Sequence, residues 1–155
     1  MFLECRTLEI DTTGGPTFGH QYTSEKLLEP GEVVLTFDDG PFPVYTQAIL
    51  DALAQECTKA TFFNVGTMVK NYPHIAQKVR DDGHTVGTHT WSHVNLAALS
   101  TEKGKSQVER AIEIENEVLP GSVAPFFRFP YLSDTPRIRN YLSTRDIATF
   151  SIDVV

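Results

Sequence analysis

Two adjacent carboxylates, Asp38 and Asp39, form the first candidate site in the sequence. They follow the apolar or β-branched residues 33–37, a composition typical of a buried strand, and precede Gly40-Pro41, where the chain turns. Neighbouring strand residues point to opposite sides, so the two carboxylates are expected to have different roles. An ordinary Asp-Gly turn is the simpler interpretation, but two consecutive acids exceed what a turn requires. The pattern therefore favours a functional site.

Two histidines spaced four residues apart, His89 and His93, form the second candidate site. This spacing places two imidazoles on one side of a helical turn. Two imidazole nitrogens and one carboxylate make a three-ligand divalent metal site that leaves room for water, as in catalytic zinc centres. One of the aspartates, Asp38 or Asp39, is the natural third ligand. The same spacing also occurs by accident, but its position after a predicted strand, like that of the aspartates, favours metal binding.

The segment R-F-P-Y, which begins at Arg128, provides a third charged group at the end of a predicted strand. A guanidinium there could hold a neighbouring carboxylate in its ionised form, which suits a base that must stay deprotonated. Alternatively, Arg128 is a rim residue whose stem packs on Phe127. The candidate substrate contacts are Trp91, Pro130 and Tyr131, because aromatic faces match the apolar faces of sugar rings. A single Trp is, however, also commonly a packing residue.

The elements that must position these residues alternate between strand and helix. Strands are predicted at 33–37, 60–65, 84–87, 126–129 and 147–152, and helices at 44–55, 73–83, 101–119 and 136–142. This alternation indicates an α/β fold with a parallel sheet built from right-handed βαβ units. Periodicity alone does not distinguish an open sheet from part of a barrel.

Residues 1–30 are expected to form an N-terminal extension, and 31–155 the domain that carries the site. The extension contains the turn-rich run T-T-G-G-P-T-F-G at 12–19, which predicts loops or a short hairpin. Alternation of apolar and polar residues at 8–10 predicts a short strand there.

The bulk composition excludes several classes of protein. A chain of 155 residues predicts one domain, and a net charge of -7 argues against a nucleic-acid partner. No apolar run approaches the roughly 20 residues of a transmembrane helix. The first residues, M-F-L-E-C-R, lack the features of a signal peptide, so such a peptide is absent or already removed. Cys5 and Cys57 could form a disulfide or remain two buried thiols.

Three motifs together resemble those of the NodB-like polysaccharide deacetylases, the family-four carbohydrate esterases. They are T-F-D-D-G-P at 36–41, H-T-W-S-H at 89–93 and R-F-P-Y at 128–131. The resemblance runs from about Glu32 to the end of the chain. It implies a distorted (β/α)7-type barrel and removal of N-acetyl groups from an N-acetylglucosamine polysaccharide, namely chitin, chitooligosaccharide or peptidoglycan. Such a substrate implies action outside the cytoplasm.

The resemblance also implies a role for each site residue. The implied metal ligands are Asp39, His89 and His93. Asp38 resembles the general base, Arg128 would orient it, and the backbone N–H of Tyr131 would help to stabilise the oxyanion. The divalent metal is expected to be zinc, with cobalt, nickel or manganese as alternatives.

Three other functions compete with N-deacetylation. The same metal and base would cleave an ester, so an O-acetyl esterase acting on acetylated xylan is the nearest alternative. A catalytically silent carbohydrate-binding relative is the second. A non-haem iron oxygenase also uses two histidines and one carboxylate, but it has no obvious use for a second aspartate or for the Arg128 motif.

The chain departs from the family pattern near its end. Family members have a fourth motif and then a Leu-x-His segment whose histidine is the general acid. In this chain, Asp153 resembles the acid that opens the fourth motif. No Leu-x-His segment follows here, and five βα units are predicted where the family has about seven. We therefore expect a partial domain completed by a missing remainder, a second polypeptide or a second copy, because an unfinished barrel exposes sheet edges. Loss by proteolysis is a further explanation. Alone, the chain is expected to bind metal but turn over poorly.

Overall fold

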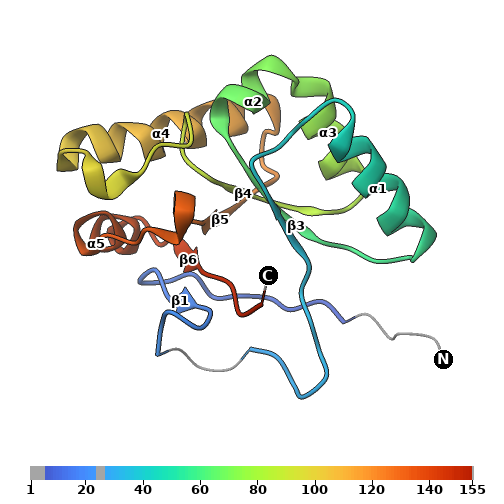
Figure 1. Cartoon of the computed structure of the whole chain (residues 1–155), viewed down its shortest axis with the longest axis horizontal. Helices are drawn as coiled ribbons and strands as arrows, with labels where there is room; N and C mark the ends of the chain where they lie inside the picture. Colours follow the sequence, from blue (N-terminus) through green and yellow to red (C-terminus); the bar gives the residue numbers. More distant parts are fainter. Residues whose placement is uncertain (1–5, 24–26, 155) are drawn as a thin grey trace.

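The computed structural model describes residues 6–23 and 27–154, in which six strands form one parallel sheet. The strands are β1 (Thr17–Phe18), β2 (Thr36–Asp38), β3 (Thr61–Asn64), β4 (Thr85–Thr88), β5 (Val123–Phe127) and β6 (Ala148–Phe150). Their order is β1-β6-β5-β4-β3-β2, and every neighbouring pair is parallel. The sheet is curled into part of a barrel (Figure 1). The predicted α/β fold and incomplete barrel are confirmed.

Helices cover the outer side of the curled sheet. They are α1 (Tyr45–Gln55), α2 (Gly66–Asn71), α3 (Pro73–Asp81), α4 (Thr101–Val118) and α5 (Pro136–Thr144), with 3-10 turns η1 (Leu96–Ala98) and η2 (Pro130–Leu132). In Figure 1, α1 to α4 arch over the sheet, α5 lies at the left, and β1 lies below. The four predicted helices are confirmed. The sequence analysis missed α2 and the 3-10 turns because such short segments carry too little periodicity.

Two hydrophobic clusters join the helices to the sheet. One contains Leu50, Leu53, Phe62, Val69, Val79, Val86 and Leu119, and the other contains Leu96, Val108, Phe127, Phe129, Ile138, Leu142 and Ile147. Burial of these side chains is the main stabilising contribution to the fold. The clusters pack against β3, β4 and β5, and the candidate site residues His89 and Arg128 directly follow the last two of these strands.

The strand predicted at 33–37 is wrong in its first half. The strand β2 begins at Thr36, which lies opposite Thr61, the first residue of β3. Residues before Thr36 therefore do not pair with a neighbouring strand. The exception is the Leu35 carbonyl, which accepts a hydrogen bond from the Thr61 N–H at 3.0 Å. Val33, which lies before the edge strand β2, is 80% exposed. Apolar composition alone does not separate an edge strand from a buried one.

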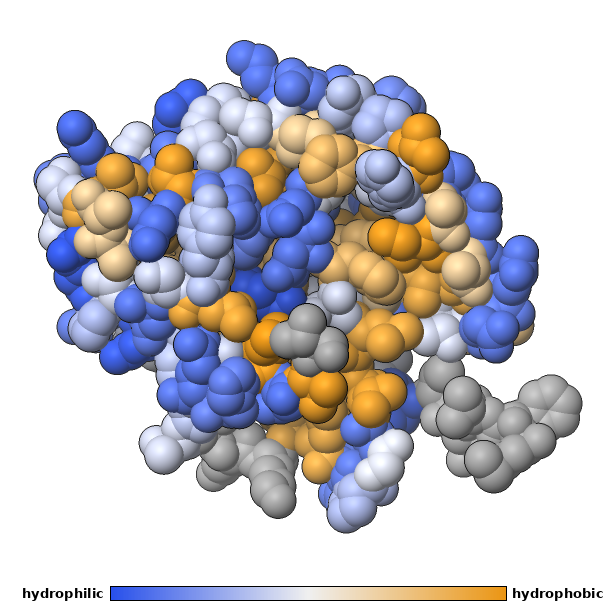
Figure 2. Space-filling view, in the orientation of Figure 1, coloured by the Kyte–Doolittle hydropathy of each residue, from blue (hydrophilic) through white to orange (hydrophobic). Residues whose placement is uncertain are grey.

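Hydrophobic side chains are exposed where the sheet stays open. The large ones are Val33, Val34, Leu35, Phe42, Val44, Tyr45, Tyr131 and Val154. Figure 2 shows hydrophobic residues gathered in the middle and lower part of this face, between the hydrophilic outer surfaces of the helices. Within the described residues, β1 and β2 are the two unpaired edges of the sheet.

The N-terminal segment contributes β1 to the sheet, with Thr17 opposite Thr149 and Phe18 opposite Phe150. The strand predicted at 8–10 is wrong, since these residues lie outside any strand. Alternation is too weak an indication when no neighbouring strand supplies hydrogen bonds. Part of the predicted extension therefore pairs directly with the sheet.

Two further expectations concern the cysteines and the membrane. Cys57 is exposed, so a buried thiol is wrong for this residue, and Cys5 lies outside the described residues. No helix in residues 6–23 and 27–154 is long and apolar enough to cross a membrane.

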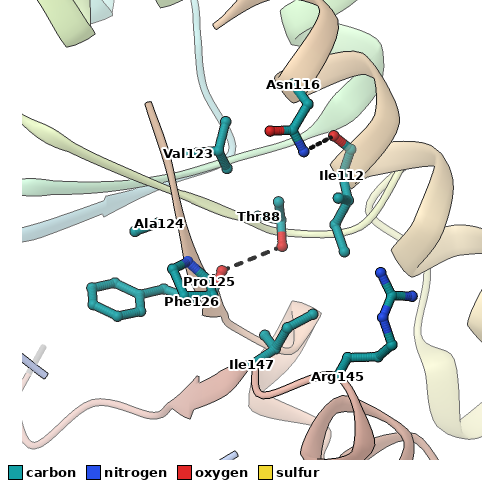
Figure 3. Close-up of a pocket in the computed structure, with 9 residues that line it drawn as sticks. All are labelled: Thr88, Ile112, Asn116, Val123, Ala124, Pro125, Phe126, Arg145 and Ile147. Atoms are coloured by element: carbon teal, nitrogen blue, oxygen red, sulfur yellow. Dashed lines mark hydrogen bonds between the residues drawn. The ribbon is translucent and has the colours of Figure 1, made fainter. Parts of the chain in front are cut away.

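A cavity of about 180 Å³ lies between α4 and β5 (Figure 3). It is lined by Thr88, Ile112, Asn116, Val123, Ala124, Pro125, Phe126, Arg145 and Ile147. Val86 lies opposite Val123 but Thr88 lies opposite Phe127, so β5 is irregular around Pro125, which has no N–H to pair. In Figure 3 the Thr88 hydroxyl points to the Phe126 carbonyl, at 3.3 Å. None of the predicted site residues lines this cavity.

Glu115, on α4, is fully buried, and neither of its carboxyl oxygens has a hydrogen-bond partner among the described residues. Burial raises the pKa of Glu115 well above its ordinary value. The folded protein thus keeps a proton that the unfolded chain loses. The contribution of this group to the free energy of unfolding is fully present below the ordinary pKa. It falls as the pH rises toward the folded-state pKa, by about 1.4 kcal/mol per pH unit.

We expect Glu115→Gln to remove this pH-dependent loss, because glutamine does not ionise. Urea unfolding between pH 5 and pH 8 should show a smaller decline in the free energy of unfolding than in the unmodified chain. Glu117→Gln is the matched control, an exposed position on the same helix. Equal declines in the two variants would contradict a neutral Glu115.

Candidate metal centre and catalytic groups

The candidate site lies at the carboxyl ends of three strands. Asp38 is the last residue of β2 and Asp39 follows it, His89 directly follows β4, and Arg128 directly follows β5. Because the strands are parallel, their carboxyl ends meet at one edge of the sheet. His93 reaches the same place from the segment after β4. The structure thus brings together all the charged site residues predicted from the sequence.

Asp39, His89 and His93 form a compact cluster of three ligand atoms. The Asp39 Oδ1 lies 3.4 Å from Nε2 of His89 and 3.1 Å from Nε2 of His93. One ligand atom of each residue lies within 4.8 Å of the others. The close contact with Nε2 of His89 is the main cause that lowers the pKa of Asp39, against desolvation and with a further contribution from the nearby His93. The carboxylate is therefore in the ionised form that binds cations.

The ring of His89 is fixed by a backbone group. This residue is 2% exposed, and its Nδ1 lies 2.7 Å from the Arg128 carbonyl. A carbonyl only accepts hydrogen bonds, so Nδ1 carries the proton and Nε2, which faces Asp39, is free to bind a cation. The His89 N–H also donates to the Asn64 carbonyl, at 2.8 Å. Such support is typical of a metal-binding histidine.

The two histidines meet without a helical turn, so that part of the sequence interpretation is wrong. Residues 89–93 contain no helix. Instead, Thr90 and His93 have φ values of 69° and 54°, in the left-handed region, and the chain folds back. The His93 N–H donates to Thr90 Oγ1 at 3.0 Å, and the two imidazole centroids lie 5.0 Å apart.

Asp38 is held by Arg128, whose Nη1 donates to its Oδ1 at 2.8 Å. The guanidinium also donates to Thr36 Oγ1 (2.8 Å), the Ser151 carbonyl (2.9 Å) and the Phe150 carbonyl (3.4 Å). Its Cζ lies 4.3 Å from the ring centroid of Phe63. Arg128 is 3% exposed, so the rim interpretation is wrong. A buried guanidinium bonded in this way keeps the Asp38 carboxylate oriented.

The turn after Arg128 presents Tyr131 at the surface. Tyr131 has φ 58° and is 68% exposed, and its ring centroid lies 4.7 Å from that of His93. Its backbone N–H donates no hydrogen bond to any described residue. Pro130, by contrast, is buried, so the prediction that it contacts substrate is not supported by its position.

Trp91 is not part of this cluster. Its ring lies in a groove between α2, α3 and α4, where the Arg110 guanidinium lies 4.1 Å from the ring centroid. Lys70 lies 6.0 Å from the same ring. Trp91 stands between the two histidines in the sequence, but the backbone turn directs it to the helix side. This position agrees with the packing alternative, and a contact between Trp91 and substrate stays a prediction.

Several residues that support the site were missed. Thr36 lies two residues before Asp38, so the alternation of a strand could have placed both on one face. Asn64, Phe63 and Ser151 lie at or near the ends of other strands, and no chemical pattern in the sequence distinguishes them. Asp153 is expected to resemble an acid of the fourth motif. It is exposed, and it is not among the hydrogen-bond partners of Arg128.

The donor set fits one divalent cation. A carboxylate oxygen and two imidazole nitrogens within 4.8 Å of one another can all reach an ion at metal–ligand distances of about 2.1 Å. Such mixed nitrogen and oxygen ligands suit zinc and its neighbours better than calcium, which prefers six or more oxygens.

Comparisons with known proteins give the family of the chain. Residues 26–149 match the polysaccharide deacetylase family. A peptidoglycan-N-acetylglucosamine deacetylase of Bacillus cereus is 43% identical over 112 residues, which are 72% of this chain and 40% of that protein. A chitooligosaccharide deacetylase of Azorhizobium caulinodans is 33% identical, over 72% of this chain and 53% of that protein.

The fold is shared with solved structures. A peptidoglycan deacetylase of Bdellovibrio bacteriovorus has a TM-score of 0.81 and 32% sequence identity, over 94% of this chain and 39% of that one. The chain thus spans about half, or less, of the length of these relatives.

Proposed function

The chain belongs to the polysaccharide deacetylase family, and from its site we propose that it is a metal-dependent hydrolase that removes N-acetyl groups from an N-acetylglucosamine-containing polysaccharide. Chitin, chitooligosaccharide and peptidoglycan are the candidate substrates, in line with the names of the relatives. The observation that carries the proposal is the Asp39, His89 and His93 cluster directly beside the Asp38–Arg128 pair.

Asp39, His89 and His93 would hold the cation, with zinc as the first candidate and cobalt, nickel or manganese as alternatives. When bound, such an ion supplies Lewis-acid polarisation of the acetamide carbonyl and a lower pKa for its water. The Nδ1 proton of His89 leaves its Nε2 available to an ion, and the Asp39 carboxylate is ionised, as binding requires.

Asp38 is the proposed general base, which takes a proton from the attacking water. The hydrogen bond from the buried Arg128 fixes the orientation of the carboxylate before the reaction. The backbone N–H of Tyr131, which donates to no described residue, would donate to the oxygen of the tetrahedral intermediate. The exposed Tyr131 ring offers an apolar face to the sugar.

Substrates of this kind place the proposed activity outside the cytoplasm. Cell-wall and extracellular glycans are polymers, and the site is open to them because the Asp39 side chain is 53% exposed. The expected second polypeptide or remainder stays a prediction.

The test compares acetate release from chitooligosaccharide and from acetylated xylan. Because turnover is expected to be slow, the zinc-loaded chain should be in excess over substrate. We expect acetate and an equal amount of free amine from the chitooligosaccharide. Acetate from xylan alone would instead assign an O-acetyl esterase. Glycan binding without acetate release from either would assign a silent carbohydrate-binding relative.

A further inference from the structure

The segment that follows β1 lies against the end of β6 and continues to the candidate site. The backbone bonds that join them run from the Thr149 N–H to Pro16 (2.9 Å), from the Ser151 N–H to Phe18 (2.7 Å) and from the His20 N–H to Ile152 (3.2 Å). At Gly19, with φ 105°, a Cβ atom would lie 2.8 Å from the Cβ of Ser151. The two segments therefore approach as closely as a glycine allows.

Gln21 connects two parts of the site through its side-chain amide. Its Oε1 accepts a hydrogen bond from the Ser151 hydroxyl at 2.5 Å, and its Nε2 donates to the Leu132 carbonyl at 3.1 Å. A carboxamide can both accept and donate in this way, which a carboxylate or an ammonium group cannot. The side chain bridges the end of β6 and the η2 turn.

Each end of this bridge is next to a catalytic group. The Ser151 carbonyl accepts from Arg128 Nη2 at 2.9 Å, and Arg128 Nη1 donates to Asp38 at 2.8 Å. On the other side, Leu132 follows Tyr131, and both have left-handed φ values, 52° and 58°. Such non-glycine conformations persist only where surrounding contacts hold them.

We propose that Gln21 is a positioning residue, which holds the Arg128–Asp38 pair through Ser151 and the Tyr131 turn through Leu132. The role in catalysis rests on the proposed deacetylation, whereas the coupling between Gln21 and Arg128 does not. The N-terminal segment is then part of the catalytic support rather than an appendage. Gln21 itself is exposed, so its substitution leaves no cavity in the core.

The test follows the Arg128 Nε–H by 15N NMR and measures its rate of hydrogen exchange. This proton belongs to a buried guanidinium and reports its fixation whether or not acetate is released. In Gln21→Leu we expect exchange to be about fivefold faster, in line with the loss of one hydrogen bond. The single-turnover rate of deacetylation should fall by a similar factor, with zinc affinity unchanged.

Two variants sharpen this test. Gln21→Glu keeps the acceptor for Ser151 and loses the donor to Leu132, so Arg128 exchange should stay as in the unmodified chain while deacetylation slows. Gln55→Leu, the same substitution at an exposed position of α1, should change neither. Arg128 exchange in Gln21→Leu equal to that in Gln55→Leu would overturn the proposal. If the unmodified chain releases no acetate but exchange still responds, the coupling stands and the proposed reaction is wrong.

Discussion

We expect Asp38→Asn to lower the rate of deacetylation about a thousandfold and to keep zinc affinity within about twofold of the unmodified chain. Asparagine has nearly the same shape, and its amide oxygen can still accept the hydrogen bond from Arg128 Nη1. It cannot take a proton from water, so the loss falls on the chemical step. Acetate release under single-turnover conditions measures the rate, and calorimetric titration measures zinc affinity.

Asp51→Asn is the matched control, because Asp51 is an exposed carboxylate on α1 and its loss should leave the rate unchanged. If Asp38→Asn and Asp51→Asn deacetylate at equal rates, Asp38 is not the base. If Asp38→Asn instead abolishes zinc binding, Asp38 is a ligand, and the division of roles between the two aspartates is wrong.

Removal of a metal ligand should have the opposite effect to Asp38→Asn, because it weakens zinc binding itself. We expect Asp39→Ala and His93→Ala each to weaken zinc binding at least about a hundredfold, since even supporting residues of metal sites contribute tenfold or more. Neither residue belongs to the buried core, so both variants should still fold cooperatively, which thermal unfolding of the metal-free chains checks. Competition with a chromophoric chelator gives the affinity.

His74→Ala is the control for this series, because His74 is exposed on α3 and belongs to no ligand cluster among the described residues. Its zinc affinity should equal that of the unmodified chain. Equal affinities in His93→Ala and His74→Ala would remove His93 from the site.

The location of the site could be predicted from sequence because parallel strands impose it. Asp38, His89 and Arg128 each follow an apolar segment, and the carboxyl ends of neighbouring parallel strands share one edge. Strand periodicity also separates Asp38 from Asp39, and the structure places them on different partners, Arg128 and the histidines. These features depend on local sequence and on a general rule of topology.

The remaining features depend on contacts that local sequence does not encode. Gln21 and Ser151 are far apart in the chain, and only the pairing of β1 with β6 joins them. The left-handed conformations of Thr90 and His93 replace the expected helical turn and direct Trp91 to the helices. The carbonyl that fixes His89 likewise comes from a distant residue.

The most direct test of the metal centre is an anomalous difference map from crystals of this chain grown with zinc and measured on both sides of the zinc absorption edge. We predict one strong peak bonded to an Asp39 carboxylate oxygen and to Nε2 of His89 and of His93, with Asp38 still paired with Arg128. Saturating zinc with no peak at these three residues, or a peak bonded to Asp38 in place of Asp39, would contradict the assignment.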